Sequence, residues 1–211
     1  MKPTIALFRK DPVAAISCCN GIINALEPYY KIKIVGKKIL DEKDLSKYKI
    51  LAFPGGSGDA DLFDRVVGNK SEAVKNYIDN GGHYLGICMG AYWAGKNYFN
   101  LIDRVKVHRY IERPSSEVKR SYQTTLEVDW KGETTQMYFF DGCSFTGKGF
   151  KTIARYANGE PMAIIKRRVG LIGCHPESDK HWYSKPYLKP YWHEKTHHKL
   201  LREFVDQLLT K

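Results

Sequence analysis

The sequence lacks any apolar run long enough to cross a membrane. A membrane-spanning helix needs about 18 or more consecutive apolar residues, and no stretch of this 211-residue chain approaches that length. The first ten residues contain only the short apolar stretch 5–8, which is too short for the hydrophobic region of a secretory signal. We therefore expect a soluble cytoplasmic protein with no membrane partner.

Paired cysteines are also missing. The five cysteines are an odd number and show no C-x-x-C spacing: Cys18, Cys19, Cys88, Cys143 and Cys174. This pattern indicates neither a disulfide framework nor a zinc knuckle, and it is typical of a reducing compartment. With 43% hydrophobic residues, the chain can bury a sizeable core without cross-links. We expect one domain over residues 1–211, with no cofactor and no metal.

Acidic residues are too few to balance the basic ones. The chain has 34 Lys and Arg against 23 Asp and Glu, which gives a formal net charge of +11. Excess positive charge can attract nucleic acid or another anion. The basic residues are scattered, however, and solvated surface lysines explain them as well. Nucleic acid is therefore only an alternative partner.

Strand and helix patterns alternate in the first half of the sequence. Short apolar stretches predict strands at 4–8, 31–35, 49–53 and 83–87, and helical spacing predicts helices at 13–26, 61–67, 71–80 and 89–97. Such alternation favours an α/β fold with a mostly parallel central sheet and helices on both faces.

The second half begins with a different pattern. Around residues 105–145, β-branched and aromatic stretches at 105–108, 122–130 and 135–140 predict an antiparallel β excursion. Further strands are predicted at 153–156, 162–166 and 169–174, and an amphipathic helix at 195–209. We find no linker that would divide the chain.

The most informative stretch is Tyr84–Ala91, which runs from a buried strand through Cys88 directly into a helix. Glycines stand two residues before and two residues after Cys88. A sharp strand-to-helix turn strains its central residue, and only small neighbours leave it room. The adjacent helix start favours thiolate over thiol. Cys88 is therefore a candidate nucleophile; the alternative is a small buried residue, as we interpret the other four cysteines.

A candidate base stands near the end of the last predicted parallel strand, in the sequence His175-Pro176-Glu177. A thiolate nucleophile needs a histidine to move protons, and the histidine needs a group that fixes its tautomer. Pro176 favours extended backbone at His175, and residues two apart in an extended segment point to the same side. Strand ends meet at one edge of a parallel sheet, so we expect His175 and Glu177 to join Cys88 there.

Attack on a carbonyl also needs N–H donors for the oxyanion. We assign these to the backbone amides of Met89, just past the nucleophile, and of Gly55 and Gly56 in the loop 54–58. A glycine-rich loop can instead cradle a phosphate, but this loop lacks the Lys-Ser/Thr ending of a Walker motif.

Taken together, the Pro-Gly-Gly loop at 54–56, the elbow at 81–92 and the late His-Pro-Glu at 175–177 resemble the class I glutamine amidotransferase superfamily. Within it, the sequence most resembles the biotin-protein ligase N-terminal-like family, because the loop continues into Asp59-Ala60-Asp61-Leu62 and the elbow into Ala91-Tyr92. The resemblance covers essentially the whole chain. It implies a flavodoxin-like sheet and a triad of Cys88, His175 and Glu177.

Two features depart from that superfamily. Members that use glutamine usually carry a glutamine where this sequence has Tyr92, and no synthetase domain is present to receive ammonia. The sequence also shows no basic glycine-arginine loop for biotinyl-adenylate. We therefore expect neither ammonia delivery nor biotinylation by this chain alone.

Three lesser features allow more than one interpretation each. His193 and His197 have a spacing that can bind a metal, but a polar helix face explains them as well. Acidic residues at 59, 61 and 64 can collect a cation or favour a helix start. The segment 181–192 can form a lid that shapes a substrate pocket, can stack on single-stranded nucleic acid, or can simply pack its aromatic residues onto the body of the protein. We assign weak substrate contacts to Tyr92, Trp182 and Tyr183.

The sequence favours a cysteine hydrolase or amidotransferase-like enzyme that acts on a small-molecule or peptide amide, with an unnamed substrate. Two alternatives stay open. One is a non-catalytic module that binds a small molecule or partner in the same pocket. The other is a basic binder of nucleic acid or another anion.

Overall fold

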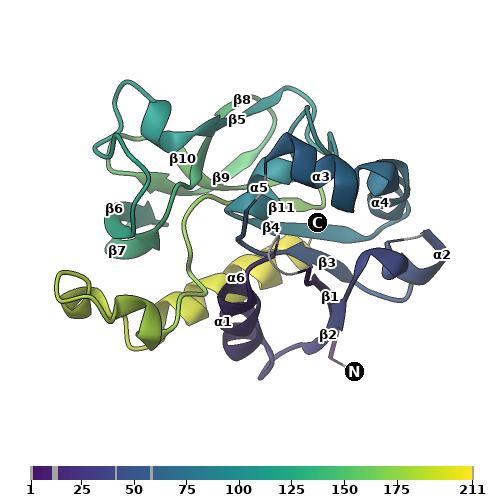
Figure 1. Cartoon of the computed structure of the whole chain (residues 1–211), viewed down its shortest axis with the longest axis horizontal. Coiled ribbons are helices and arrows are strands. Elements are labelled where there is room, and N and C mark those ends of the chain that lie inside the picture. The colour runs from purple at the N-terminus through teal and green to yellow at the C-terminus, as the bar shows by residue number, and fades with distance from the viewer. Residues whose placement is uncertain (1, 11–13, 41, 58, 211) are drawn as a thin grey trace.

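The computed structural model describes residues 2–10, 14–40, 42–57 and 59–210. Within them, nine strands form one sheet in the order β2-β1-β3-β4-β11-β10-β9-β6-β7, and two more strands form a small separate sheet (Figure 1). The large sheet contains β1 (Thr4–Phe8), β2 (Lys31–Val35), β3 (Ile50–Phe53), β4 (His83–Ile87), β6 (Thr124–Trp130), β7 (Glu133–Phe139), β9 (Lys151–Tyr156), β10 (Pro161–Lys166) and β11 (Val169–Ile172). The small sheet pairs β5 (Val105–Arg109) with β8 (Cys143–Gly147).

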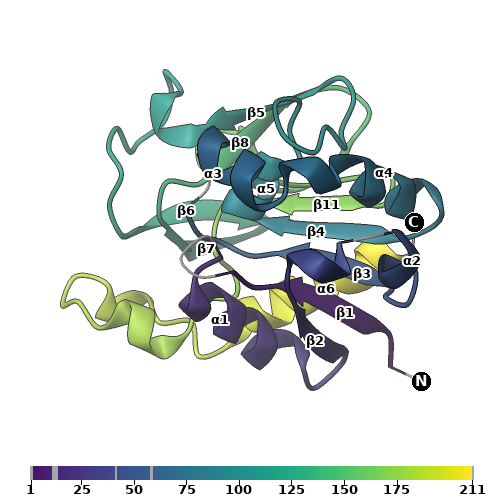
Figure 2. The same cartoon turned by 45° about the vertical axis from the view of Figure 1, so that its right-hand side comes forward.

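Helices cover both faces of the sheet. The α-helices are α1 (Ile16–Leu26), α2 (Glu42–Leu45), α3 (Ala60–Val66), α4 (Ser71–Asp79), α5 (Met89–Trp93) and α6 (Thr196–Leu209). Helices α1 and α6 pack together on one side, and α3, α4 and α5 lie on the other (Figures 1 and 2). Short 3-10 turns occupy Lys37–Ile39, Gly68–Lys70, Tyr110–Glu112, Lys180–Tyr183 and Lys189–Tyr191. No helix in the described part of the chain is long and apolar enough to cross a bilayer.

The large sheet has two halves with different pairing. Strands β2, β1, β3, β4 and β11 run parallel, and β11, β10, β9, β6 and β7 are joined by antiparallel pairs. The structure thus confirms the α/β fold and its antiparallel region. That region extends past 145 to Lys166, because β10 returns to β11 through a tight turn at Arg167, whose φ is 50°.

Most predicted elements lie within a few residues of their positions in the structure. The helix predicted over 89–97 ends at Trp93, because turns closed by the carbonyls of Tyr92 and Trp93 replace it. The strand β8 was not predicted. The start of the helix predicted over 13–26 falls at Val13, outside the described residues, and α1 begins at Ile16.

Burial explains why the parallel strands read as continuous apolar runs. Every residue of β3 and β4 is buried, as expected of strands covered on both faces. The ring of Phe53 stacks on Phe8 and Tyr84, with centroids 4.8 and 5.6 Å away. Burying each such ring contributes roughly 1.5–3 kcal/mol, so these three rings help to hold β1, β3 and β4 together beneath the candidate site.

Candidate active site

Cys88 lies at a strained turn between β4 and α5. Its φ of 49° and ψ of −104° place it in a backbone region that side chains rarely adopt. A Cβ on Gly86 would lie 2.4 Å from the Gly90 carbonyl oxygen, and a Cβ on Gly90 would lie 2.1 Å from the Phe53 carbonyl oxygen. Neither position therefore has room for a side chain. The two glycines let the helix start pack directly against β3.

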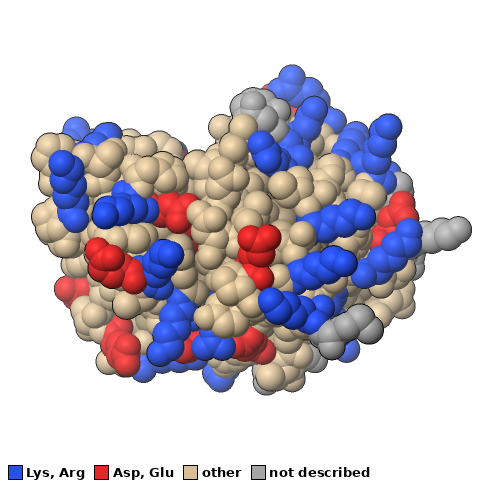
Figure 3. Space-filling model, turned by 90° about the horizontal axis from the view of Figure 1, so that it is seen from below, with Lys and Arg blue, Asp and Glu red and all other residues tan. Residues whose placement is uncertain are grey.

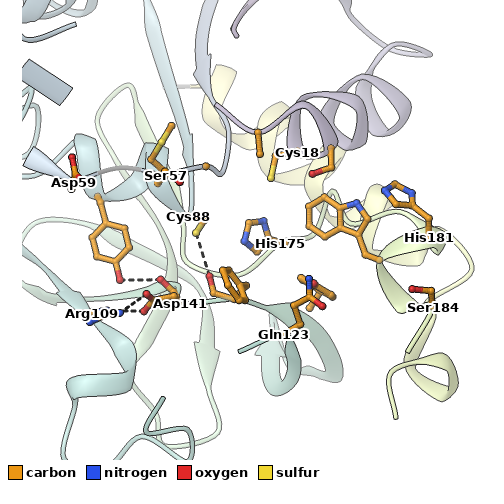
Figure 4. A pocket seen from close by; sticks show the side chains of 18 of the residues that line it. Cys18, Ser57, Asp59, Cys88, Arg109, Gln123, Asp141, His175, His181 and Ser184 are labelled. Carbon is orange, nitrogen blue, oxygen red and sulfur yellow. Dashed lines mark hydrogen bonds and ion pairs between the residues drawn. The ribbon is translucent and has the colours of Figure 1, made fainter. Parts of the chain in front are cut away.

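Sheet register brings His175 to this turn. Strand β11 pairs in parallel with β4, with Ile172 opposite Ile87, and the Cys88 amide donates to the Ile172 carbonyl at 2.9 Å. Three residues later, the His175 amide donates to the Tyr138 carbonyl at 2.9 Å. The imidazole then lies beside the Cys88 thiol and interacts with it (Figure 4).

The third predicted residue, Glu177, lies where it can orient the imidazole. The Nδ1 of His175 is 2.9 Å from Oε1 of Glu177, and both side chains are buried. Burial alone would lower the pKa of His175. The charge of Glu177 and the interaction with Cys88 outweigh burial and raise that pKa well above its ordinary value. The site therefore favours a protonated imidazole beside the sulfur.

The three residues predicted to bind the oxyanion take different positions at the site. Met89 and Gly56 line the cavity described below. Gly55 lies against the imidazole: a Cβ there would be 2.7 Å from Cε1 of His175 and 2.9 Å from Sγ of Cys18. The Gly55 carbonyl accepts from the Ala15 amide at 3.0 Å, which fixes the loop to the start of α1. Gly58, the last residue of the predicted loop, lies outside the described residues.

A cavity of about 800 Å³ opens above Cys88 and His175. Aromatic side chains from several elements form much of its wall: Tyr92, Tyr98, Tyr138, Phe140 and Trp182. Two of the predicted substrate contacts, Tyr92 and Trp182, are among them. Tyr183 is not, because its ring is buried against Tyr138 and its hydroxyl pairs with Oγ of Ser178.

The segment after β7, which sequence reasoning missed, forms one side of the site. The Phe140 carbonyl accepts from Sγ of Cys88 at 3.7 Å, and the Tyr92 hydroxyl donates to the carbonyls of Asp141 at 3.2 Å and Gly142 at 2.9 Å. The Asp141 carboxylate holds Arg109 at the cavity wall, with nitrogen–oxygen distances of 2.7 and 2.5 Å (Figure 4). Most of these contacts are made by backbone carbonyls, which every residue has. The sequence therefore contains no sign that this segment contributes to the site.

A second thiol, also missed, lies beside the triad. Cys18 extends from α1 toward His175 and lines the same cavity (Figure 4). Burial raises the pKa of Cys18, an effect that its hydrogen bond with His175 partly offsets. The sequence indicated a small buried residue; Cys18 is indeed buried, but against the candidate catalytic base. No motif surrounds Cys18, so no signal in the sequence marked this contact.

Three histidines at the start of the last helix bond to protein oxygens: His193, just before α6, and His197 and His198, in its first turn. Nε2 of His193 and Nε2 of His198 lie 3.0 and 3.1 Å from the Ser178 carbonyl, and Nε2 of His197 lies 2.8 Å from Oγ1 of Thr135. Burial lowers the pKa of His193 to about 4 and that of His197 to about 3. His193 and His198 hold Ser178, the residue after Glu177, and His197 joins α6 to β7. Among the acids, Asp59 caps α3 by accepting from the Leu62 amide at 2.7 Å.

Comparison with solved structures identifies the class of fold. A glutamine amidotransferase from Thermotoga maritima superposes with a TM-score of 0.71 at 12% identity over 100% of both chains. A second glutamine amidotransferase gives 0.64 at 16% identity, covering 98% of this chain and 99% of the other. A third, from Methylobacillus flagellatus, gives 0.62 at 11% identity, covering 100% of this chain and 93% of the other. The chain therefore has a class I glutamine amidotransferase-like, flavodoxin-like fold.

The sequence comparison links the first half of the chain to a narrower group. Residues 12–109 match the family described as "Biotin-protein ligase, N terminal". This range holds the Gly55-Gly56 loop and Cys88, and it ends before the segment that carries His175 and Glu177. No curated protein matches the sequence. The resemblance to the biotin-protein ligase N-terminal family is confirmed over residues 12–109, and the glutamine amidotransferase-like fold is confirmed by the solved structures.

Proposed function

We propose that this protein is a cysteine-dependent hydrolase or amidotransferase-like enzyme that acts on an amide-type carbonyl. The observation that carries the proposal is the buried pair of His175 and Glu177 beside a thiol raised on a strained strand-to-helix turn. The fold supports the coarser statement, a glutamine amidotransferase-like function. A nucleophile, a base and a group that orients the base are the parts that acyl transfer by cysteine requires.

The chemistry follows from these positions. The Cys88 thiolate forms a bond to the carbonyl carbon, and the carbonyl electrons move onto oxygen, toward the amides of Gly55, Gly56 and Met89. Protonated His175 then gives its proton to the amine nitrogen, and the carbon–nitrogen bond breaks. Neutral His175 next takes a proton from water, and the resulting hydroxide attacks the thioester. The carbon–sulfur bond breaks, the carboxylic acid leaves, and the Cys88 thiolate reforms beside protonated His175. Glu177 keeps the imidazole in place throughout.

The substrate is proposed only as a class. The cavity of about 800 Å³ is roomy enough for a small molecule or the end of a peptide. Tyr92 occupies the position where the resembling enzymes that use glutamine carry that residue, and here its hydroxyl supports the opposite wall. We therefore propose an amide with an apolar or aromatic group beside the scissile bond.

Thiol reactivity tests the proposal without a known substrate. Iodoacetamide followed by mass spectrometry should label Cys88 ahead of the other four cysteines. Removing a general base typically costs about 10²–10⁴-fold in the chemical step, so His175→Ala should slow labelling of Cys88 by at least about tenfold. Cys19→Ala is the matched control, because Sγ of Cys19 bonds to the Phe8 carbonyl at 3.7 Å, outside the cavity. Slow, unselective labelling of all cysteines in the wild type would refute an activated thiol.

A screen identifies the substrate class. We expect an amide library, assayed for released amine, to give turnover with the wild type and none with Cys88→Ala. If both proteins bind the same compounds without releasing amine, the cavity is a binding site, and the non-catalytic alternative replaces the enzyme.

The face drawn in Figure 3 does not present the pattern that the nucleic-acid alternative requires. On the face shown in Figure 3, Lys and Arg gather toward the right-hand side, and on the left they are interspersed with Asp and Glu, so that they do not form one continuous stripe across the face. A stripe of positive charge is what backbone-tracking nucleic-acid binders present. We therefore keep the hydrolase proposal alone.

A further inference from the structure

One buried thiol at the site has no role in the proposed mechanism. Cys18 lies on the first turn of α1, and Gly21 stands one turn later on the same helix. A Cβ on Gly21 would lie 2.3 Å from the Glu177 carbonyl oxygen, so α1 packs directly on the segment that holds His175 and Glu177. This close packing is what brings the Cys18 thiol to the triad.

The three side chains form a set of metal donors. One donor atom each from Cys18, His175 and Glu177 lie within 4.8 Å of one another, the only such group found in residues 2–10, 14–40, 42–57 and 59–210. The exposed fractions of these residues are 6%, 4% and 0%. Flexible surface acids, which gather by chance, do not explain a buried set from two separate elements.

One oxygen of Glu177 is free to accept a cation. Oε1 of Glu177 contacts His175, but Oε2 is buried and has no hydrogen-bond partner among the described residues. Leaving a buried acceptor unsatisfied costs about 1–3 kcal/mol, and more for a charged group. A bound cation would satisfy this oxygen and balance the negative charge of the carboxylate and thiolate.

The donor types select the metal. Thiolate, imidazole and carboxylate are the three ligand types of zinc, and a site with three protein ligands leaves a fourth position open. Cys18 and His175 line the cavity, which provides the way in. Harder cations such as Mg²⁺ and Ca²⁺ prefer oxygen ligands alone.

We propose that Cys18, His175 and Glu177 form a Zn²⁺ site that competes with the Cys88 triad for the same imidazole and carboxylate. Binding releases the proton of the Cys18 thiol and any proton on the coordinating nitrogen of His175. The imidazole then no longer serves Cys88. The inhibition rests on the proposed function, whereas the metal site itself does not.

Cobalt tests the metal site directly, because a thiolate bound to Co²⁺ gives a near-ultraviolet charge-transfer band. Wild type titrated with Co²⁺ should develop that band and lose it when Zn²⁺ is added. Cys18→Ser should lose the band, and its affinity for Zn²⁺ should fall by at least about 10–100-fold. That is the loss typical when a residue that only supports a metal ligand is replaced, and removing a ligand itself should cost no less. Cys88→Ser, and the control Cys19→Ser on the same helix, should both keep the band. Circular dichroism of each variant checks that it is folded.

Opposite results would overturn the site. A band that persists in Cys18→Ser and disappears in Cys88→Ser would assign the metal to the nucleophile, and no band in folded wild type would remove the site. Loss of the band in a folded Cys19→Ser variant would also count against it.

Inhibition is measured separately, as the ratio of Cys88 labelling rates with and without Zn²⁺. That ratio should fall at least tenfold in wild type and stay near one in Cys18→Ser at the same metal concentration. Equal protection by Zn²⁺ in both proteins would refute competition through Cys18. If Cys88 shows no enhanced labelling at all, the hydrolase proposal fails, while the cobalt result still decides the metal site.

Discussion

The two halves of the large sheet contribute to the site in different ways. The parallel half supplies reactive groups at strand ends: Cys88 after β4, His175 after β11 and Gly55 after β3. The antiparallel half supplies backbone oxygens, because the carbonyls of Tyr138 and Phe140 accept from the His175 amide and the Cys88 thiol. The candidate catalytic side chains therefore come from one half and much of their positioning from the other.

This difference has a physical origin. Parallel strands end at one common edge, so side chains just after them converge whatever their distance in sequence. Antiparallel strands extend past that edge and bring their main chain over it, where carbonyls accept hydrogen bonds. A substitution should therefore have its largest effect where parallel strand ends pack backbone to backbone, and smaller effects in the antiparallel half.

The largest effect is expected from Gly90→Ala. The new Cβ would lie 2.1 Å from the Phe53 carbonyl, and neither backbone can yield without moving β3 from α5. Overpacking typically costs 1–3 kcal/mol and more when backbone must shift. We expect a loss of at least about 3 kcal/mol in the free energy of unfolding, measured with urea.

Gly132→Ala is the matched control in the antiparallel half. Gly132 has a φ of 91° in the turn between β6 and β7, and a Cβ there would meet nothing within 4 Å. Only the left-handed backbone opposes alanine, which costs about 1–2 kcal/mol. Equal losses in the two variants would contradict the distinction between the halves.

Acid should destabilise the junction between α6 and the antiparallel half. His193 and His197 have pKa values lowered by burial to about 4 and about 3. The unfolded chain binds these protons at the ordinary pKa of 6.5, so their contribution is complete above pH 6.5 and is lost as pH falls toward 4. We expect a loss on the order of 3 kcal/mol for each histidine by pH 4, measured by urea unfolding across pH.

His193→Gln should be less stable than wild type at pH 7 and should flatten this pH dependence. The contribution of His175 has the opposite sign: its raised pKa gives stability below pH 6.5 that is lost as pH rises through that pKa. A pH dependence that is the same in His193→Gln as in wild type would show that neutral His193 does not brace Ser178.

The same contrast explains how much of the protein could be predicted from sequence. The parallel strands, the elbow at Cys88 and the His175-Glu177 pair all carry residue patterns, because burial on both faces requires apolar runs and a tight turn requires glycine. Strand β4 was predicted over its observed span, His83–Ile87. The strand ends then implied the site.

The missed features carry no such pattern. Phe140 and Asp141 act at the site mainly through carbonyls, which every residue has. Cys18 contacts His175 only because α1 packs closely on the segment at Glu177, a tertiary contact that helix periodicity does not specify. Strand β8 is short and pairs only with β5, so its residues show no long alternation. Local patterns predicted elements, whereas contacts between elements needed coordinates.

A moderate loss of stability is expected from Tyr92→Phe, which removes one hydroxyl that links the two halves of the sheet. This hydroxyl donates to the carbonyls of Asp141 and Gly142 and so ties α5 to the segment after β7. Its loss leaves those acceptors without a donor from Tyr92, at a cost of about 1–2 kcal/mol. Urea unfolding measures this loss of stability. The control is Tyr122→Phe, because Tyr122 is exposed and its substitution should change stability by less than about 0.5 kcal/mol. Equal stability of the two variants would show that this tie is not needed.

The smallest effect on stability is expected from Arg109→Gln. The guanidinium pairs with Asp141 at the cavity wall, but 44% of its side chain is exposed, and exposed ion pairs are worth about 0–1 kcal/mol. Its effect should instead appear at the site, because Arg109 lines the cavity beside the segment that contacts Cys88. We expect unfolding within about 1 kcal/mol of wild type at 0.15 M salt, together with altered preference in the amide screen. A loss of stability as large as that of Gly90→Ala would mean that this wall is structural, and the proposed contrast between reactive and supporting halves would fail.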